Sequence, residues 1–441
     1  MEKVVKFEKI HANGAGIDVG SREIFVSIDG EQVVKFGTFT SDYHSCCTYL
    51  KANGIESAAM EATGVYWMSL YAILEQYDIK VCLVHPREVQ QVKGRKTDVK
   101  DSQWIQKLYT AGLLRESIVA EGLLKELRIL IRERLDLIQM GSAYVNKMQK
   151  YMELMNIKLR NVISQIHGAS GLRIIRAIID GERDPHKLIH LCHENIKNRK
   201  REEVIKSLEG NYHESYILLI KENLRLWDEH QDSIRSIEQQ IAALLEKMNQ
   251  NNKHMEVTSR SKPARHHNPQ IKDLHKTMVQ LYDGVNLTTI TGINDCTMLR
   301  LAGEIGFDMS RFPTVKQFVS WLGLSPKNKQ SGKMKKRLRS DANKAGLILR
   351  QSAQSLMNSK DSAIGVFIRR LKGRKGSPVA IKAGARKLAI ALYNALTKGI
   401  DYVEQVAARY AVQIKQREFR LLQKLAFKYK YYLIDCEGVI A

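Results

Sequence analysis

The sequence lacks several features that would assign a protein to a common class. It has no apolar run near the roughly 20 residues of a membrane-spanning helix, and MEKVVKFEKI at its start lacks the apolar centre of a signal peptide. Its six cysteines form no CxxC pair and no secreted-type framework, so we expect reduced thiols. A GxxxxGK[ST] phosphate loop is also absent. We therefore expect a cytoplasmic protein with no membrane span, no disulfides and no P-loop.

The positive charge of the chain is concentrated near its C-terminus. The 441 residues carry a net charge of +23. Residues 1–119 hold 14 Lys and Arg against 15 Asp and Glu, whereas residues 327–430 hold 26 against 5. Such a concentration is typical of proteins that bind a polyanion, and without a membrane anchor we expect nucleic acid rather than lipid.

The hydrophobic pattern predicts four parts. Residues 1–119 alternate strand-like and helical runs, which indicates an α/β domain. Residues 120–250 carry two apolar seams at heptad spacing, Val145 to Ile166 and Ile217 to Met248, which predict long helices paired as a coiled coil. That pairing could form within one chain or between chains. We expect a polar linker over 251–273 and a basic, mostly helical domain over 274–441.

Two carboxylates fall on or beside predicted strands of the first domain. Asp18 lies within the strand-like stretch GIDVGSREIFVS, where an aspartate is costly to bury unless it is paired or bound to a cation. Glu61 follows the strand-like run from Ser57 to Met60. Ligands gather where the strands of an open α/β sheet end, so Glu61 can converge with Asp18. The alternative for Asp18 is a capping or turn role.

Asp98 and Asp101 are three residues apart, so they share one face of the first turn of a predicted helix. Alone, they could simply favour the helix dipole. Together with Asp18 and Glu61 they form an all-oxygen ligand set, which is typical of Mg²⁺ and of two-metal phosphodiester transfer. Lys96 and Lys100, close by, could contact phosphates or balance the acids.

The C-terminal part contributes a candidate nucleophile and two basic segments. Ser331, with Gly332, is expected in a flexible loop, where a serine either forms an ordinary turn or acts as a nucleophile activated by nearby cations. Downstream, an amphipathic basic helix is suited to lie along a phosphate backbone. The candidate nucleic-acid contacts of the two segments are Lys333, Lys335, Lys336, Arg337, Arg339, Arg369, Arg370, Lys372, Arg374 and Lys375.

A series of motifs follows in order along the chain: GIDVGSREIFVSI, MEATGVYW, VHPREVQQVKGRKTDVKDSQWIQKLYTAGLL, TTITGI, LAGEIG, WLGLSP, QSGK and KAGARKLAIALYNAL. Together these motifs resemble transposases of insertion sequence family 110, in particular its 1111 subgroup. The resemblance implies a RuvC-like domain of the ribonuclease H fold that binds Mg²⁺ through Asp18, Glu61, Asp98 and Asp101. It also implies a C-terminal transposase domain in which Ser331 is the catalytic serine.

The same resemblance implies a site-specific recombinase that acts on double-stranded element and target DNA. Its guide is a structured RNA that the element itself encodes and that pairs with both DNAs. Because two active sites must act on two duplexes, we expect a homo-dimer or tetramer assembled through the coiled coil.

Other functions compete with this one. The first is a RuvC-like structure-specific endonuclease, in which the four carboxylates activate water and Ser331 is structural. The second is a sugar-kinase-like or actin-like ATPase, which would need further phosphate and adenosine loops that the sequence lacks. The third is a nucleic-acid-binding protein without catalysis. Ser331 separates the recombinase from the endonuclease, because hydrolysis needs no protein nucleophile.

Overall fold

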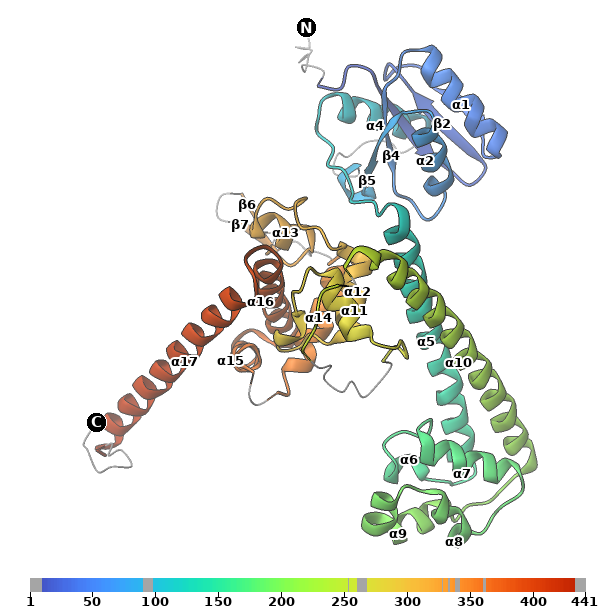
Figure 1. The fold of residues 1–441 in the computed structure, drawn as a ribbon, viewed down its shortest axis with the longest axis vertical. Coiled ribbons are helices and arrows are strands. Elements are labelled where there is room, and N and C mark those ends of the chain that lie inside the picture. Colours follow the sequence, from blue (N-terminus) through green and yellow to red (C-terminus); the bar gives the residue numbers. More distant parts are fainter. Residues whose placement is uncertain are drawn as a thin grey trace. The chain divides into compact units, whose positions relative to one another are not determined.

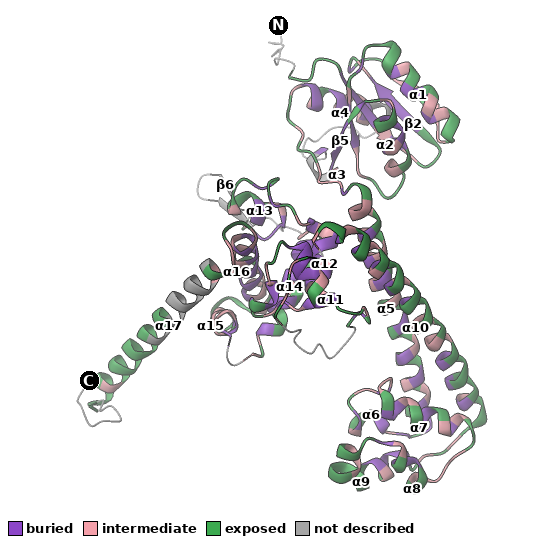
Figure 2. Ribbon diagram, in the orientation of Figure 1, coloured by how far each residue is buried: buried purple, intermediate pink, exposed green. Residues whose placement is uncertain are grey.

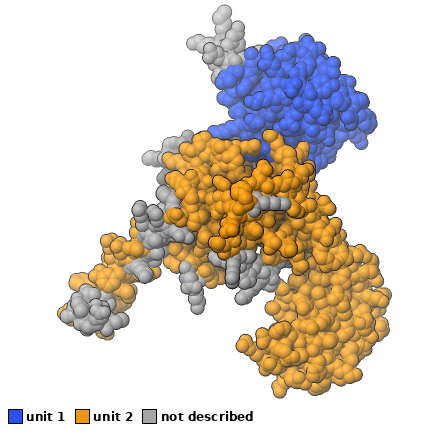
Figure 3. Space-filling model, viewed as in Figure 1, with its two compact units in different colours: residues 1–120 blue, residues 121–441 orange. Residues whose placement is uncertain are grey.

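The computed structural model describes most of the chain: residues 10–89, 98–252, 254–259, 268–326, 328–331, 334–337, 342–359 and 362–432. Some side chains within these ranges lie outside the description, including those of residues 98–100, 328–331 and 334–337. The chain forms two compact units, Met1–Ala120 and Glu121–Ala441 (Figure 3). In the described part, no helix combines the length and apolarity needed to cross a membrane.

The first unit is built on one mixed five-stranded sheet (Figure 1). The strands are β1 (Gly14–Val19), β2 (Glu23–Ser27), β3 (Val34–Gly37), β4 (Ser57–Glu61) and β5 (Lys80–Val84). Their order is β3-β2-β1-β4-β5. Strand β2 is antiparallel to its neighbours β1 and β3, whereas β4 and β5 run parallel to β1. This confirms the predicted α/β class.

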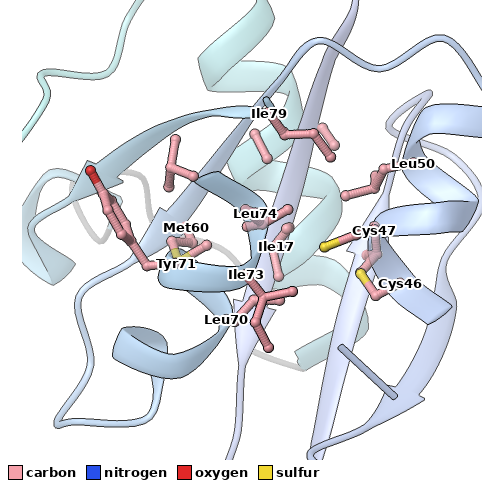
Figure 4. Close-up of a cluster of buried hydrophobic side chains, with 14 of the residues drawn as sticks. Ile17, Cys46, Cys47, Leu50, Met60, Leu70, Tyr71, Ile73, Leu74 and Ile79 are labelled. Atoms are coloured by element: carbon pink, nitrogen blue, oxygen red, sulfur yellow. The ribbon is translucent and has the colours of Figure 1, made fainter. Parts of the chain in front are cut away.

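Two helices, α1 (Thr40–Ala52) and α2 (Trp67–Gln76), share one hydrophobic core with the sheet (Figure 4). Ile17 of β1 and Met60 of β4 are fully buried in this core. Burial raises the pKa of the Cys46 thiol to about 12. The thiol therefore stays protonated and packs as a small apolar group.

Helix α4 (Asp98–Thr110) packs on β1 and β4 through a second core. Ile105 and Tyr109 of α4 are buried there with Ala59 of β4. Side chains alternate between the two faces of a strand, so Ala59 and its neighbour Met60 belong to opposite faces. Helix α4 thus covers the face of the sheet opposite α1 and α2. A short helix, α3 (Pro86–Val89), follows β5.

Helix α4 approaches β1 closely because two residues of the strand have no side chain. A Cβ added at Gly16 would overlap the backbone of Ser102 and Gln106. The buried Gln106 side chain holds this arrangement, since its Nε2 donates to the carbonyl oxygens of Gly14 (3.3 Å) and Ile28 (3.0 Å). The glycines therefore fix the position of α4 on the strand that carries Asp18.

The second unit contains a hairpin of two long helices, α5 (Gly122–Leu154) and α10 (Glu214–Met248). Figure 1 shows them side by side along their length. The second apolar seam lies within α10, and most of its residues, such as Ile241, are buried inside the single chain.

The two helices run in opposite directions. The ring of Tyr151 stacks on Tyr216 with centroids 6.3 Å apart, and Tyr144 meets His230 with centroids 5.0 Å apart. Residue numbers therefore fall along α5 as they rise along α10. This is the antiparallel pairing within one chain that the sequence left open.

The first apolar seam is only partly one helix. Val145 and Met152 are buried on α5, as predicted, but the seam extends back to Leu127. The prediction of one helix as far as Ile166 is wrong, because α5 ends at Leu154. The chain then turns at Asn156, whose φ of 62° is left-handed and ends the helix.

One buried ion pair joins the two long helices. Arg134 Nε lies 2.7 Å from Glu238 Oε1, and each side chain is only 4% exposed. The second oxygen of Glu238 accepts a hydrogen bond from the backbone N–H of Gln270 (2.8 Å). Glu238 is one of the two polar residues in the second seam. Its partner explains why a carboxylate can occupy that position, since buried charges persist only when paired.

Shorter helices connect the end of α5 to the start of α10, and they share a hydrophobic core with both long helices. They are α6 (Leu159–Val162), α7 (Ala169–Ile179), α8 (Pro185–Leu188), η1 (Ile189–Leu191) and α9 (Glu194–Leu208). A further single turn, η2 (Gln250–Asn252), follows α10.

The remaining chain is mostly helical, as predicted, with one two-stranded hairpin. Its elements are α11 (Leu274–Leu281), η3 (Leu287–Thr289), α12 (Asp295–Ile305), α13 (Val315–Trp321), β6 (Asn328–Ser331), β7 (Met334–Arg337), α14 (Lys344–Leu356), α15 (Ala363–Lys375), α16 (Ser377–Lys398) and α17 (Ile400–Tyr429). Arg132 of α5 binds Glu304 of α12 through two hydrogen bonds of 2.8 Å. Figure 2 shows that α12 and α14 are largely buried, whereas the described side chains of α17 are mostly exposed.

Replacing Gly16 by alanine tests the contact between β1 and α4. We expect Gly16→Ala to destabilise the first unit by about 1–3 kcal/mol, because the methyl group overlaps the backbone of α4. Hydrogen exchange of peptides from β1 and α4 measures the change.

Gly141→Ala is the matched control. Gly141 lies inside α5, and a Cβ there meets nothing within 4 Å. Alanine should leave exchange in the first unit unchanged and stabilise α5 by about 0.5–1 kcal/mol. Equal protection of β1 in wild type and Gly16→Ala would contradict the proposed contact.

Candidate active site

The half-buried Asp18 is the penultimate residue of β1. Since successive side chains of a strand point to opposite faces, Asp18 shares a face with Gly14 and Gly16. The glycines place that face against α4. The carboxylate therefore lies on the α4 side of the sheet, near the end of the strand.

Glu61 is the last residue of β4 and lies beside Asp18. In the parallel register, Gly16 is opposite Ala59 and Ile17 is opposite Met60. One further step along both strands brings Asp18 opposite Glu61. Neighbouring strands are about 4.8 Å apart, so the two carboxylates are adjacent on one face. Like charges this close repel unless a proton or a cation lies between them.

A hydrogen bond restrains one oxygen of Glu61. The hydroxyl of Thr63 donates to Glu61 Oε1 at 2.6 Å. An ionised carboxylate has further acceptor positions on its two oxygens, so Glu61 retains acceptor capacity for another ligand.

The first turn of α4 meets the same edge of the sheet. Gly14 approaches Tyr109, and Gly16 approaches Ser102 and Gln106, so the helix runs opposite to the strand. Two strand residues span about 6.6 Å, which is roughly four residues of helix at about 1.5 Å each. Continuing this progression places Asp18 beside the first turn of α4.

That turn carries the two other predicted ligands. Asp98 is the first residue of α4, although its side chain lies outside the described residues. Asp101 is half-buried. The backbone therefore brings β1, the end of β4 and the start of α4 together, as the sequence predicts.

The donors at this edge fit a hard divalent cation, because carboxylate oxygens are its preferred ligands. Among the described side chains, no three His, Cys, Asp or Glu residues already cluster around one point. The fourth acid, Asp98, is not among those side chains. Sequence reasoning assigned no role to His85, which directly follows β5 at the same edge and is exposed. The sequence signal that could have identified His85 as a candidate was its position directly after a predicted strand.

Ser331 lies in the second unit. It is the last residue of β6, paired with Met334 of β7 in an antiparallel ladder. The predicted flexible loop over Ser331 and Gly332 is therefore wrong for Ser331, because the backbone there is in a strand. Gly332 and Lys333 between the strands, and the side chain of Ser331, lie outside the described residues.

The predicted nucleic-acid contacts fall into two groups. In the first group, Lys96, Lys333 and Arg339 lie outside the described residues, and only the backbone is described for Lys100 in α4 and for Lys335, Lys336 and Arg337 in β7. In the second group, Arg369, Arg370, Lys372, Arg374 and Lys375 are all exposed on α15. The structure therefore presents five cations along one exposed helix.

A hydrogen-bonded chain that the sequence analysis missed involves another serine. Ser259 Oγ lies 2.9 Å from His275 Nε2, and His275 Nδ1 lies 2.6 Å from Asp295 Oδ1. His275 and Asp295 are buried, whereas Ser259 is half-buried. This connectivity matches a nucleophile, base and acid. It also ties residues 254–259 to α11 and α12. No signal in the sequence joins these separated residues.

Two protein-family models match the chain. A transposase model named for the DEDD domain of IS110 elements matches residues 15–157, which include all four candidate acids. A second model, described as transposase IS116/IS110/IS902 family, matches residues 285–364, which include Ser331. No curated protein matches the chain. The DEDD domain implies a divalent metal cation.

Divalent cation binding can be tested by thermal unfolding. A ligand bound only to the native state at 100 times its Kd stabilises it by about 2.7 kcal/mol. We expect Mg²⁺ or Mn²⁺ to raise the Tm of the first unit in wild type and to lose most of this effect in Asp18→Asn. Glu75→Gln, at an exposed position of α2, should retain it. An equal Tm increase in Asp18→Asn would place the cation elsewhere.

Proposed function

Because the chain belongs to the IS110 family of transposases, which transpose DNA, we propose that it is an RNA-guided, site-specific recombinase. In this proposal it cuts and rejoins DNA through a carboxylate site in the first unit and a serine in the second. The observation that carries the proposal is the backbone register that sets Asp18 beside Glu61 and near the first turn of α4.

In this proposal Asp18, Glu61, Asp98 and Asp101 hold Mg²⁺. When bound, the cation supplies Lewis-acid stabilisation of the charge on the scissile phosphate. The acids contribute position: two on adjacent strands and two on one helical turn. Thr63 orients Glu61 through its hydrogen bond to Oε1.

Ser331 is the proposed nucleophile. Its hydroxyl loses a proton and forms a bond to phosphorus, while the P–O bond to the leaving strand breaks and that oxygen gains a proton. The resulting phosphoserine ester retains the energy of the broken bond, so DNA can be rejoined without ATP. Two features support this role: the match of residues 285–364 to a transposase model, and the cations Lys335, Lys336 and Arg337 on the paired strand.

The proposed partners are duplex DNA and a structured guide RNA encoded by the element. Residues 327–430, with 26 Lys and Arg against 5 Asp and Glu, provide the positive field for them. We further propose that the protein acts as a homo-dimer or tetramer, because two duplexes require two active sites. The long-helix seams are already paired within the chain, so the assembly needs further surface besides the buried seam.

The endonuclease alternative uses the same four carboxylates but needs no serine. A second alternative assigns the covalent step to Ser259, and it is favoured by the hydrogen-bonded chain to His275 and Asp295. Each alternative predicts a different response to replacement of one serine, so both can be separated from the proposal.

We expect wild type, with Mg²⁺ and guide RNA, to form a covalent protein–DNA adduct that denaturing electrophoresis resolves. Ser331→Ala should abolish the adduct because the attacking oxygen is absent. Asp18→Asn should reduce its rate by at least about 100-fold, a loss similar to that from removing one important charge-stabilising group.

Ser259→Ala is the matched control, since it removes the same hydroxyl from another serine of the second unit. It should still form the adduct. An adduct abolished by Ser259→Ala but retained by Ser331→Ala would reassign the nucleophile. Equal cutting by both variants with no adduct would replace the proposal with a nuclease.

A further inference from the structure

A groove outside the predicted active site lies between α15, α16 and α17. Its volume is about 1010 Å³, and its lining includes side chains from all three helices. The family models end at residue 364, before the first of these lining residues, Val366. The groove combines a cationic rim with an apolar floor, which together indicate a particular kind of ligand.

Helix α15 supplies one side of the rim. Arg369, Arg370 and Arg374 line the groove and are exposed. The guanidinium of Arg369 is held in place because it donates to the carbonyl oxygens of Met357 (3.2 Å) and Ser359 at the end of α14. No ion pair to Arg370 or Arg374 is seen among the described side chains.

Helix α17 supplies the other side. Arg417, Arg420 and Lys424 are spaced by three and four residues, so they share one face of the helix. Glu418 is the only acid among the described lining residues. The rim therefore carries a large excess of positive charge.

The lining also contains apolar side chains, which we call the floor: Phe367 and Leu371 of α15 and Leu421 of α17. Lys387 Nζ of α16 lies over the Phe367 ring, 4.6 Å from its centroid. Burial lowers the pKa of Lys387, and the nearby positive charge of Arg417 lowers it further. Lys387 and Arg417 repel each other, and an anion bound between them would reduce this repulsion.

The chemistry of the groove selects among possible ligands. A second copy of this chain would bring the same positive rim into contact with itself, so charge repulsion disfavours it. A duplex could reach the cations, but its base faces are stacked inside and cannot contact the apolar floor. An unpaired strand offers phosphates to the rim and base faces to the floor, which is the usual way single strands are bound. Because Lys387 covers one face of the Phe367 ring, a base would stack on the other face.

We propose that this groove binds an unpaired stretch of RNA. The choice of RNA rests on the proposed function: a guide must carry unpaired bases before it pairs, whereas the DNA substrates arrive as duplexes. Beyond the groove, the end of α17 and the residues after it expose Phe427, Tyr429, Tyr431 and Tyr432, at 88%, 61%, 75% and 84%. These rings extend the possible stacking surface in the same direction along the chain.

The test is fluorescence anisotropy with the full chain and a labelled single-stranded RNA of mixed sequence. The double variant Arg370→Glu with Arg420→Glu reverses one charge on each side of the rim. We expect it to weaken RNA binding at least tenfold and to reduce the salt slope by about 1.4, since each phosphate contact to a single strand contributes about 0.7. Phe367→Leu keeps an apolar floor but removes the ring, and should weaken binding about tenfold, which is within the range of one base stack.

The control double variant is Lys221→Glu with Lys247→Glu, which makes the same charge change at exposed positions of α10. It should bind RNA as wild type does. Labelled single-stranded DNA, duplex DNA and poly-glutamate complete the comparison. The proposal predicts that each binds more weakly than RNA and that Phe367→Leu does not affect duplex binding.

Three results would overturn the groove assignment: no loss of RNA binding in the groove variants, an equal loss for duplex DNA in Phe367→Leu, or tighter binding of single-stranded DNA or poly-glutamate. If wild type binds RNA normally while the groove variants also do, only the groove assignment fails. If wild type binds no RNA, the RNA-guided function fails with it.

Discussion

The close approach of α4 to β1 is the constraint on which the candidate active site depends. At Gly16 the helix backbone occupies the space that a side chain would fill, and Gln106 holds it there through hydrogen bonds to Gly14 and Ile28. The first turn of α4 is thereby placed beside the end of β1. Because β4 is parallel to β1 and pairs with it in this register, Glu61 lies opposite Asp18. The strand pairing alone is enough to place the two carboxylates side by side.

The second unit of this IS110-family transposase is organised differently. Its helices pack on one another through a hydrophobic core, and two charged contacts add to this packing: Arg134 to Glu238 between the long helices, and Arg132 to Glu304 between α5 and α12. The pair of Arg134 and Glu238 is buried, so it favours one arrangement of the long helices, because a mispaired buried charge would be costly. Among the described side chains, exposed cations lie on α15 and α17. These exposed cations are different residues from the arginines that join the helices.

Much of the fold could be predicted from the sequence, whereas the contacts between distant segments could not. Alternation around Asp18 and the run before Glu61 indicated strands, and heptad spacing indicated α10. The same spacing continued past Asn156, where a left-handed residue ends α5, so periodicity alone could not locate that end. Arg134 interrupts the apolar pattern of α5 before Val145, so the pattern did not indicate the first part of that seam. Its buried partner, Glu238, lies 104 residues away in the sequence. Ser331 was expected in a loop because a two-stranded hairpin of mostly polar residues has no hydrophobic pattern.

The most direct test of the central claim is site-localised backbone cleavage by Fe²⁺ in place of the native cation. With ascorbate and peroxide, bound Fe²⁺ generates radicals that cut the nearest backbone. Mass spectrometry of the fragments then identifies those positions. We expect three groups of cuts, near Asp18, near Glu61 and within the first turn of α4, all suppressed by excess Mg²⁺. Cuts confined to one of these segments, or located elsewhere in the chain, would contradict a shared carboxylate site.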